Sequence, residues 1–161
     1  MKKQNIVFLG IGTNKGIRKK NISNALELLS RNKDLKILKV SKMLKNPPRE
    51  GIKSGYFLNG AIKMETSLKP MELLRVCKNI EKKLGRTIEQ GDHGTMGQEK
   101  KRIYFSRTID LDILFYGNLI LKSKTLTIPH PRIEKRDFVL IPLKEILLNP
   151  HKHRKLSKCS I

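Results

Sequence analysis

The chain has 161 residues with 38% apolar side chains, enough for one domain with a hydrophobic core. Its 35 lysines and arginines outnumber its 14 acidic residues, and the formal charge of +21 favours a polyanionic partner: nucleic acid, an anionic membrane or a polyphosphate ligand. Two cysteines make neither a zinc motif nor a disulfide framework, and no run of 18 apolar residues is present, so we expect a soluble cytoplasmic protein without a membrane partner.

The first part of the chain predicts a strand, a helix and a second strand. Residues 5–11 form an apolar run that ends in the stretch GIGTN, typical of a buried strand followed by a turn. Apolar side chains recur at helical spacing between residues 19 and 32. Residues 35–44 have one apolar and one mixed face, which indicates a half-exposed or edge strand. Thr13 and Asn14 are interpreted as turn-forming residues.

A proline-rich loop and a third strand follow. The sequence NPPREG cannot continue a strand because proline lacks a backbone N–H, and the loop that runs to Gly55 is either a binding loop or a plain connector. Residues 57–66 alternate as a strand and carry Asn59, a residue type that strands disfavour. An amide there can recognise the edge of a heterocycle or make a structural hydrogen bond to a loop, and the sequence leaves both interpretations open.

A second helix is predicted over residues 71–84, with Pro70 at its first position and Gly85 as its stop. Glu81 lies beside its apolar stripe and is expected to face solvent or the rim of a site. Residues 86–106 contain three glycines, few apolar residues and a Lys-Lys-Arg cluster. Because a connector of this length is typical of a functional loop, we interpret it as a lid that closes over phosphates.

The next stretch, RTIDLDILF, has the alternation of a strand. Apolar residues at the odd positions from 109 to Phe115 are expected on one face, and Asp110 and Asp112 on the other. Two carboxylates whose Cα atoms are roughly 6–7 Å apart repel each other unless a cation lies between them. Mg²⁺ is typically bound by one or two carboxylates plus substrate phosphates, so the pair predicts a Mg²⁺–nucleotide site. The alternative is a polar strand face that is merely solvated.

The last part of the chain predicts short strands at residues 119–121 and 125–128 and a helix that begins at Asp137. His130 follows the second of these strands and is expected within reach of a bound phosphate. The order β-α-β-β-α-β predicts an α+β fold, a ferredoxin-like sandwich with an extra C-terminal strand and helix. We expect residues 1–161 to form a single domain in which residues 149–161 are a basic, loosely ordered tail.

Several stretches together resemble the 6-hydroxymethyl-7,8-dihydropterin pyrophosphokinase family. They are FLGIGTN, then NPP with YFLNGAIKMETSLKPMELL, then IEKKLGR, RTIDLDILFYG and LTIPHPRIEKRDFVLIPL. The resemblance implies a Mg²⁺-dependent diphosphotransferase of folate biosynthesis. Such an enzyme transfers pyrophosphate from ATP to 6-hydroxymethyl-7,8-dihydropterin and releases the pterin diphosphate and AMP.

The same resemblance implies roles for individual residues. Asp110 and Asp112 would bind two Mg²⁺ ions, and with Arg86 and Arg107 they form the implied catalytic set. The ATP-binding residues that it implies are Glu81, Arg86, Arg107, Ile113, Thr127, His130 and Arg136. The pterin-binding residues that it implies are Pro47, Phe57, Asn59 and Phe138.

A different class of function stays open from composition alone. The net charge of +21 suits a basic RNA-binding module on a ferredoxin-like sheet, which needs aromatic residues on an open sheet face to stack bases. The chain has no tryptophan and only 5% aromatic residues, so we do not expect a nucleic-acid partner. We expect a monomer that binds ATP and the pterin.

Overall fold

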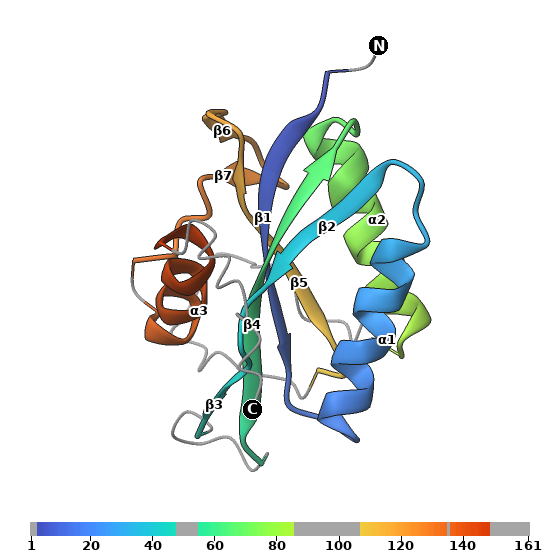
Figure 1. Ribbon diagram of the computed structural model, residues 1–161, viewed down its shortest axis with the longest axis vertical. Coiled ribbons are helices and arrows are strands. Elements are labelled where there is room, and N and C mark those ends of the chain that lie inside the picture. Colours follow the sequence, from blue (N-terminus) through green and yellow to red (C-terminus); the bar gives the residue numbers. More distant parts are fainter. Residues whose placement is uncertain (1–2, 48–54, 86–106, 135, 149–161) are drawn as a thin grey trace, which may run out of the picture.

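An antiparallel sheet with the strand order β2-β4-β1-β5 forms the centre of the fold (Figure 1). The computed structural model describes residues 3–47, 55–85, 107–134 and 136–148. The strands of this sheet are β1 (Asn5–Thr13), β2 (Leu35–Val40), β4 (Phe57–Thr66) and β5 (Asp110–Tyr116), and β3 (Leu44–Asn46) pairs with the start of β4. A separate two-stranded sheet contains β6 (Leu121–Lys122) and β7 (Thr127–Ile128).

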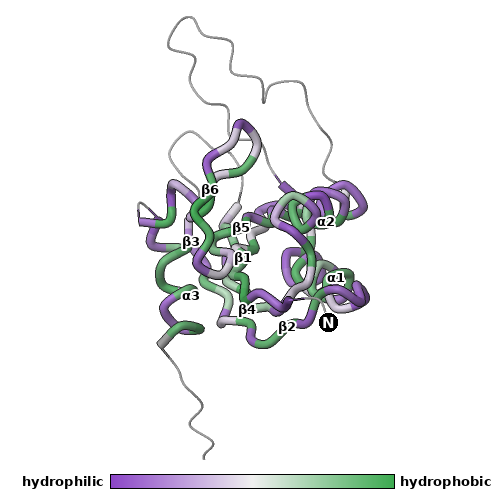
Figure 2. Tube along the Cα trace, turned by 90° about the horizontal axis from the view of Figure 1, so that it is seen from above, coloured by the Kyte–Doolittle hydropathy of each residue, from purple (hydrophilic) through white to green (hydrophobic). Residues whose placement is uncertain are grey.

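Helices cover both faces of the sheet (Figure 1). One face packs against α1 (Arg18–Ser30) and α2 (Pro70–Lys83), whose outer sides are hydrophilic in Figure 2. The other face packs against α3 (Asp137–Leu148). The four long strands alternate with α1 and α2 as β-α-β-β-α-β, so the predicted α+β, ferredoxin-like fold is confirmed. None of the helices in the described ranges is long and apolar enough to cross a membrane.

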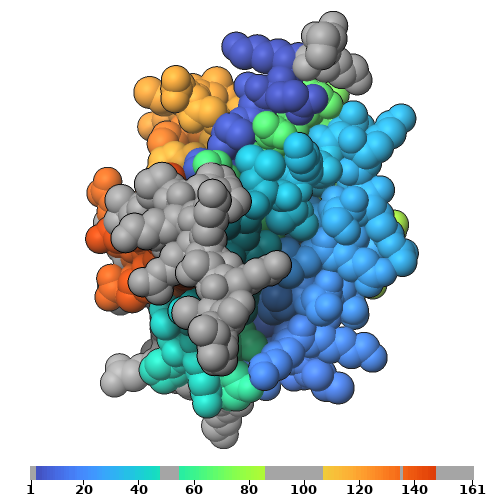
Figure 3. All heavy atoms as spheres, in the orientation of Figure 1, coloured from blue at the N-terminus to red at the C-terminus, as the bar shows by residue number. Residues whose placement is uncertain are grey.

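The predicted edge strand over residues 35–44 is interrupted. Ser41 lies between β2 and β3; its backbone N–H donates to the Ala61 carbonyl at 2.9 Å, and its hydroxyl accepts from the Ala61 N–H at 2.9 Å. Because the hydroxyl replaces a backbone carbonyl in this pairing, the strand breaks there without leaving a buried donor unpaired. β2 pairs only with β4 among the described strands, and its side chains lie beside those of α1 on the molecular surface (Figure 3).

A β-bulge changes the faces of β5. Pairing with β1 shifts register between Phe8 and Leu9, so Leu114 is an extra residue on β5. Before the bulge, Leu111 and Ile113 face the core under α1 and α2 as predicted. After it, Phe115 packs with the core under α3, so the prediction that it shares their face is wrong. Strict period-two alternation cannot anticipate this, because the bulge depends on the partner strand.

Glu81 is fully buried between α2 and β5, which corrects the expectation that it faces solvent or a site rim. Its Oε1 accepts a hydrogen bond from the Leu111 N–H at 2.8 Å, and the Lys78 ammonium lies 3.1 Å from its Oε2. A backbone donor that would otherwise be buried without a partner is thereby satisfied. Glu81 therefore holds β5 against α2.

We expect Glu81→Ala to lower the free energy of unfolding by about 1–3 kcal/mol, because the Leu111 N–H loses its acceptor. Glu81→Gln keeps an oxygen at that place and should lower it less. Urea unfolding of the two variants beside the unmodified protein measures the difference, and equal stability of the alanine and glutamine variants would contradict the role of the hydrogen bond.

Candidate active site

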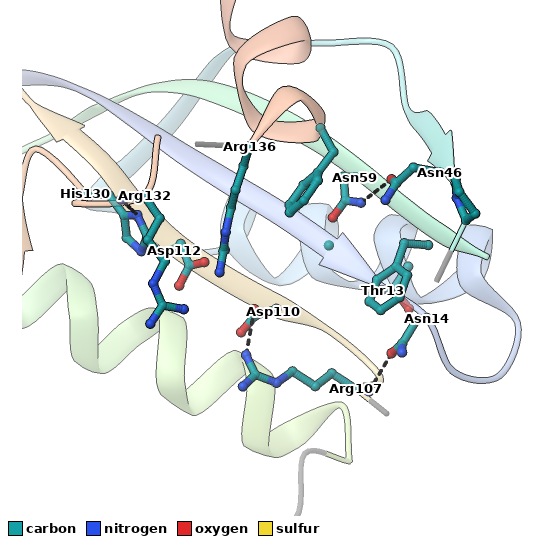
Figure 4. A pocket seen from close by; sticks show the side chains of 14 residues that line it. Thr13, Asn14, Asn46, Asn59, Arg107, Asp110, Asp112, His130, Arg132 and Arg136 are labelled. Carbon is teal, nitrogen blue, oxygen red and sulfur yellow. Dashed lines mark hydrogen bonds and ion pairs between the residues drawn. The ribbon is translucent and has the colours of Figure 1, made fainter. Parts of the chain in front are cut away.

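A cavity of about 240 Å³ opens on the α3 side of the sheet, where the end of β1 meets the starts of β4 and β5 (Figure 4). It is lined by residues far apart in sequence: Gly12, Thr13, Asn14, Asn46, Pro47, Phe57, Asn59, Arg107, Asp110, Asp112, His130, Arg132, Arg136 and Phe138. Most residues predicted for catalysis, ATP binding or pterin binding therefore share one cavity.

Strand register places the two ends of this cavity in one row across the sheet. Gly12 of β1 lies opposite Asn59 of β4 on one side and opposite Asp110 of β5 on the other. Neighbouring strands are about 4.8 Å apart, so Asn59 and Asp110 are separated by about 10 Å. Directly opposed residues point to the same face, and glycine between them leaves the floor of the cavity open.

The predicted shared face of Asp110 and Asp112 is confirmed, since both line the cavity. The Asp110 Oδ2 accepts a hydrogen bond from the Arg107 Nη1 at 2.8 Å, and the two side chains form an ion pair. Burial raises the pKa of Asp112, and the neighbouring Asp110 carboxylate raises it further. An ionised Asp112 is thus disfavoured unless positive charge is supplied.

The donor set suits a hard divalent cation. Two carboxylates on one strand face repel each other and are partly desolvated, and both effects are relieved by a cation with oxygen ligands. Within the described ranges no group of three or more His, Cys, Asp or Glu side chains gathers. The remaining ligands of such a cation would be water or substrate oxygens, which is the usual coordination of Mg²⁺.

Basic side chains surround the carboxylates. Arg107, Arg132 and Arg136 line the same cavity, together with His130. Burial lowers the pKa of His130 although the Asp112 carboxylate acts in the opposite direction, so a neutral imidazole is favoured. Its Nδ1 accepts a hydrogen bond from the Arg132 N–H at 3.2 Å, which leaves the proton on Nε2. His130 can then donate that proton in a hydrogen bond to an anionic oxygen.

The opposite end of the cavity is built around an amide. The Asn59 Nδ2 donates to the Asn46 Oδ1 at 2.6 Å, and a Cβ atom on Gly12 would lie only 2.6 Å from the Asn59 Oδ1. Gly12 therefore leaves the space in which this amide rests. Phe57 and Phe138 also line the cavity. An amide next to two aromatic rings can hydrogen-bond and stack a flat heterocycle.

Two polar residues at the end of β1 are part of the site rather than of a simple turn. The buried Asn14 accepts a hydrogen bond from the Arg107 N–H through Oδ1 at 2.6 Å and donates its own N–H to the Arg107 carbonyl at 3.1 Å. Thr13 is also buried, and its hydroxyl accepts from Asn21 Nδ2 at 3.4 Å. The sequence interpretation missed their place in the site, although two polar residues directly after a buried strand were a usable signal.

Other predicted ATP-binding residues lie away from the cavity. Ile113 is buried in the core under α1 and α2, Thr127 is half-buried in β7, and Glu81 bonds to the backbone of β5. Arg86 and the predicted lid of residues 86–106 lie outside the described residues. Contacts of these groups with ATP stay predictions. Asn46 and Gly12 were not singled out from sequence, because their importance arises from contacts with Asn59.

The raised pKa of Asp112 predicts an effect on stability. A carboxyl whose pKa is higher in the folded than in the unfolded chain weakens folding when ionised, and this loss disappears as the pH falls through the folded pKa. We therefore expect Asp112→Asn to melt at a higher temperature than the unmodified protein in metal-free buffer at about pH 7.5, with a smaller difference at about pH 5. Thermal unfolding followed by circular dichroism measures it.

Asp110→Asn is the matched comparison for this experiment. Its carboxylate is paired with Arg107, so the substitution removes a favourable contact as well as the repulsion with Asp112, and it should raise the melting temperature less than Asp112→Asn does. A lower melting temperature for Asp112→Asn than for the unmodified protein at both pH values would contradict the assignment.

The chain is similar to known proteins over most of its length. The family model described as 7,8-dihydro-6-hydroxymethylpterin-pyrophosphokinase (HPPK) matches residues 8–148. The 2-amino-4-hydroxy-6-hydroxymethyldihydropteridine pyrophosphokinase of Bacillus subtilis is 36% identical over 142 residues, which are 88% of this chain and 78% of that protein. The enzyme of the same name from Aquifex aeolicus is 39% identical over 141 residues, 87% of this chain and 79% of that protein.

Longer relatives contain a similar segment. The folic acid synthesis protein fol1 of Schizosaccharomyces pombe is 35% identical over 97% of this chain, which spans only 20% of that protein. A crystal structure of Plasmodium falciparum HPPK-DHPS matches 90% of this chain and 38% of its own with a TM-score of 0.56. At 17% identity this likeness supports the fold alone. The family model and the bacterial relatives establish the kinship, and the prediction from the sequence motifs is confirmed: this chain belongs to the 7,8-dihydro-6-hydroxymethylpterin-pyrophosphokinase (HPPK) family.

Proposed function

We propose that this chain transfers pyrophosphate from ATP to 6-hydroxymethyl-7,8-dihydropterin, giving the pterin diphosphate and AMP, a step of folate biosynthesis. The observation that carries the proposal is the single cavity in which a carboxylate pair with basic neighbours faces an amide beside two aromatic rings. The first end suits a metal-bound triphosphate, and the second suits a flat heterocycle. Membership of a pyrophosphokinase family supports this pairing of ligands.

At the phosphate end, each residue has a distinct task. Asp110 and Asp112 would hold Mg²⁺, two ions by family resemblance. When bound, the metal would neutralise phosphate charge and lower the pKa of the attacking hydroxyl. Arg107 and Arg136 donate to phosphate oxygens with their planar guanidinium groups, and His130 donates through Nε2. Arg86 is assigned the same task by the resemblance. Positive charge concentrated on one side of the cavity favours a tetraanionic ligand there.

At the pterin end, Asn59 is proposed to read the polar edge of the heterocycle. Its Nδ2 already donates to Asn46, so the orientation of the amide is set before the ligand arrives. Phe57 and Phe138 would flank the ring, and Pro47 would cover it; all three line the cavity. A rigid amide and rings fix the hydroxymethyl group in one direction, toward Asp110.

The chemistry then requires alignment more than a protein nucleophile. The β-phosphorus gains a bond to the pterin hydroxyl oxygen, whose proton passes to water, and loses its bond to the oxygen that bridges to the α-phosphorus. That oxygen leaves with AMP, and cationic groups neutralise the charge that develops on it. Holding both reactants in one row across the sheet converts the encounter into a reaction between neighbours.

The RNA-binding alternative has no support in the fold. It requires an open sheet face with exposed aromatic rings. Here α3 packs over that face, and Phe8 and Phe115 meet edge to face with ring centroids 6.2 Å apart beside the core under α3. A single domain over residues 1–161, a monomeric state and a cytoplasmic location stay predictions.

Release of AMP tests the proposed reaction. The unmodified protein should form AMP from ATP and Mg²⁺ only when the hydroxymethyldihydropterin is added. Asp110→Ala should reduce turnover by about 10³-fold or more, because the phosphate charge is no longer neutralised. Chromatography of the nucleotides measures both. AMP formation without the pterin, or full turnover by a folded Asp110→Ala variant, would contradict the proposal.

Gly12 and Gly10 give a matched pair of substitutions. A Cβ atom at Gly12 would displace the Asn59 amide, whereas a Cβ at Gly10 would meet Leu114 Cδ2 at 3.5 Å, an ordinary contact. We expect Gly12→Ala to raise the KM for the pterin about tenfold, the value of one hydrogen bond of about 1.4 kcal/mol. Gly10→Ala should raise it much less. Steady-state kinetics measures the KM for the pterin in both variants. Equal KM values would contradict the inference that Gly12 leaves space for the Asn59 amide.

A further inference from the structure

Glu145 of α3 connects the last helix with the interrupted edge strand. Its Oε2 accepts a hydrogen bond from the Lys42 N–H at 3.1 Å, and its carbonyl accepts one from the Lys39 Nζ at 3.4 Å. Lys42 lies in the gap between β2 and β3, outside the ladders that pair both strands with β4. Its N–H therefore takes its acceptor from another element, and a side chain of α3 supplies it.

Glu145 lies in a well-packed part of α3. Its neighbours Leu143 and Ile146 are buried in the core between α3 and the sheet. Apolar packing has no preferred direction, whereas a hydrogen bond requires a particular distance and angle. The Glu145 carboxylate therefore fixes where the segment after Ser41 lies relative to the helix.

This segment leads directly to the amide end of the cavity. A Cβ atom on Gly60 would lie 2.6 Å from the Met43 Cε, so Met43 packs closely against the residue that follows Asn59. β3 comes next and ends at Asn46, whose Oδ1 accepts from the Asn59 Nδ2 at 2.6 Å (Figure 4). β3 has only three residues and pairs with β4 alone among the described strands, so a contact from α3 adds a second point of attachment.

We propose that Glu145 is a positioning residue for the amide end of the cavity: through Lys42 it fixes β3, so that Asn46 holds the Asn59 amide in place for the heterocycle. The inference rests on the proposed function, which supplies the heterocycle. A shift of β3 would carry Asn46 away from Asn59, and a hydrogen bond weakens steeply outside its favoured distance and angle. Because the bond to Lys42 lies at the surface, its loss should change substrate recognition more than the free energy of unfolding.

Steady-state kinetics at saturating ATP and Mg²⁺ tests the proposal. We expect Glu145→Ala to raise the KM for 6-hydroxymethyl-7,8-dihydropterin about three- to tenfold, the range for one hydrogen bond. The kcat and the KM for ATP should change by less than about twofold, because the phosphate end is not displaced. Glu145→Gln keeps an oxygen acceptor for the Lys42 N–H and should restore the pterin KM to within about twofold of the unmodified value.

A double-mutant cycle separates positioning from a general effect on folding. Asn46→Ala removes the group through which Glu145 is proposed to act, so adding Glu145→Ala to it should raise the pterin KM by less than about twofold further. Two independent effects would multiply instead. Lys144→Ala removes one charge from an exposed neighbour on α3 and should leave the pterin KM unchanged.

The outcomes that overturn the proposal differ from those that overturn the reaction. An unchanged pterin KM in folded Glu145→Ala, an equal increase in Glu145→Gln, or the full increase in the Asn46→Ala background would each refute the positioning role. If Glu145→Ala does not fold, Glu145→Asp, which withdraws the carboxylate by one methylene group, takes its place with the same expected increase. If the unmodified protein forms no AMP with the pterin, the proposed function itself fails, and the role of Glu145 fails with it.

Discussion

Gly12 lies on β1 between β4 and β5, and the site depends on this position. β1 is central in the sheet, so one of its residues has partners on both sides, here Asn59 and Asp110. Since opposed residues share a face, an amide and a carboxylate are held about 10 Å apart on rigid backbone. A side chain at residue 12 would fill the space between them and displace the amide. The separation is set by strand spacing rather than by loops, and it suits two substrates that must meet end to end.

In the absence of ligands, the protein environment disfavours the charged forms of two side chains in this site. Burial and the Asp110 carboxylate disfavour an ionised Asp112, and burial disfavours a protonated His130. Positive charge that favours the ionised carboxylates is supplied partly by Arg107, Arg132 and Arg136, and a bound metal would supply most of it. Glu81 of α2 accepts the Leu111 N–H and stabilises the strand that carries the aspartates. Stability and function thus depend on different carboxylates around one strand.

Much of the fold and part of the site could be predicted from local patterns in the sequence. Period-two alternation predicted the shared face of Asp110 and Asp112, and the order of elements predicted the ferredoxin-like sheet. The face of Phe115 could not be predicted, because the bulge is a property of the strand pair. Asn14 has the composition of a turn residue whether or not it also binds Arg107, and Asn46 gains its role from a side chain 13 residues away. Such long-range polar contacts leave no periodic signal in a sequence.

The central claim is that Asp110 and Asp112 together capture the metal that fixes the triphosphate. Electron paramagnetic resonance of Mn²⁺, titrated into the protein with α,β-methylene-ATP, measures that capture without turnover. The account predicts a saturable Mn²⁺ site in the unmodified protein and its loss in Asp110→Asn and in Asp112→Asn. Undiminished Mn²⁺ binding in both aspartate variants would contradict it.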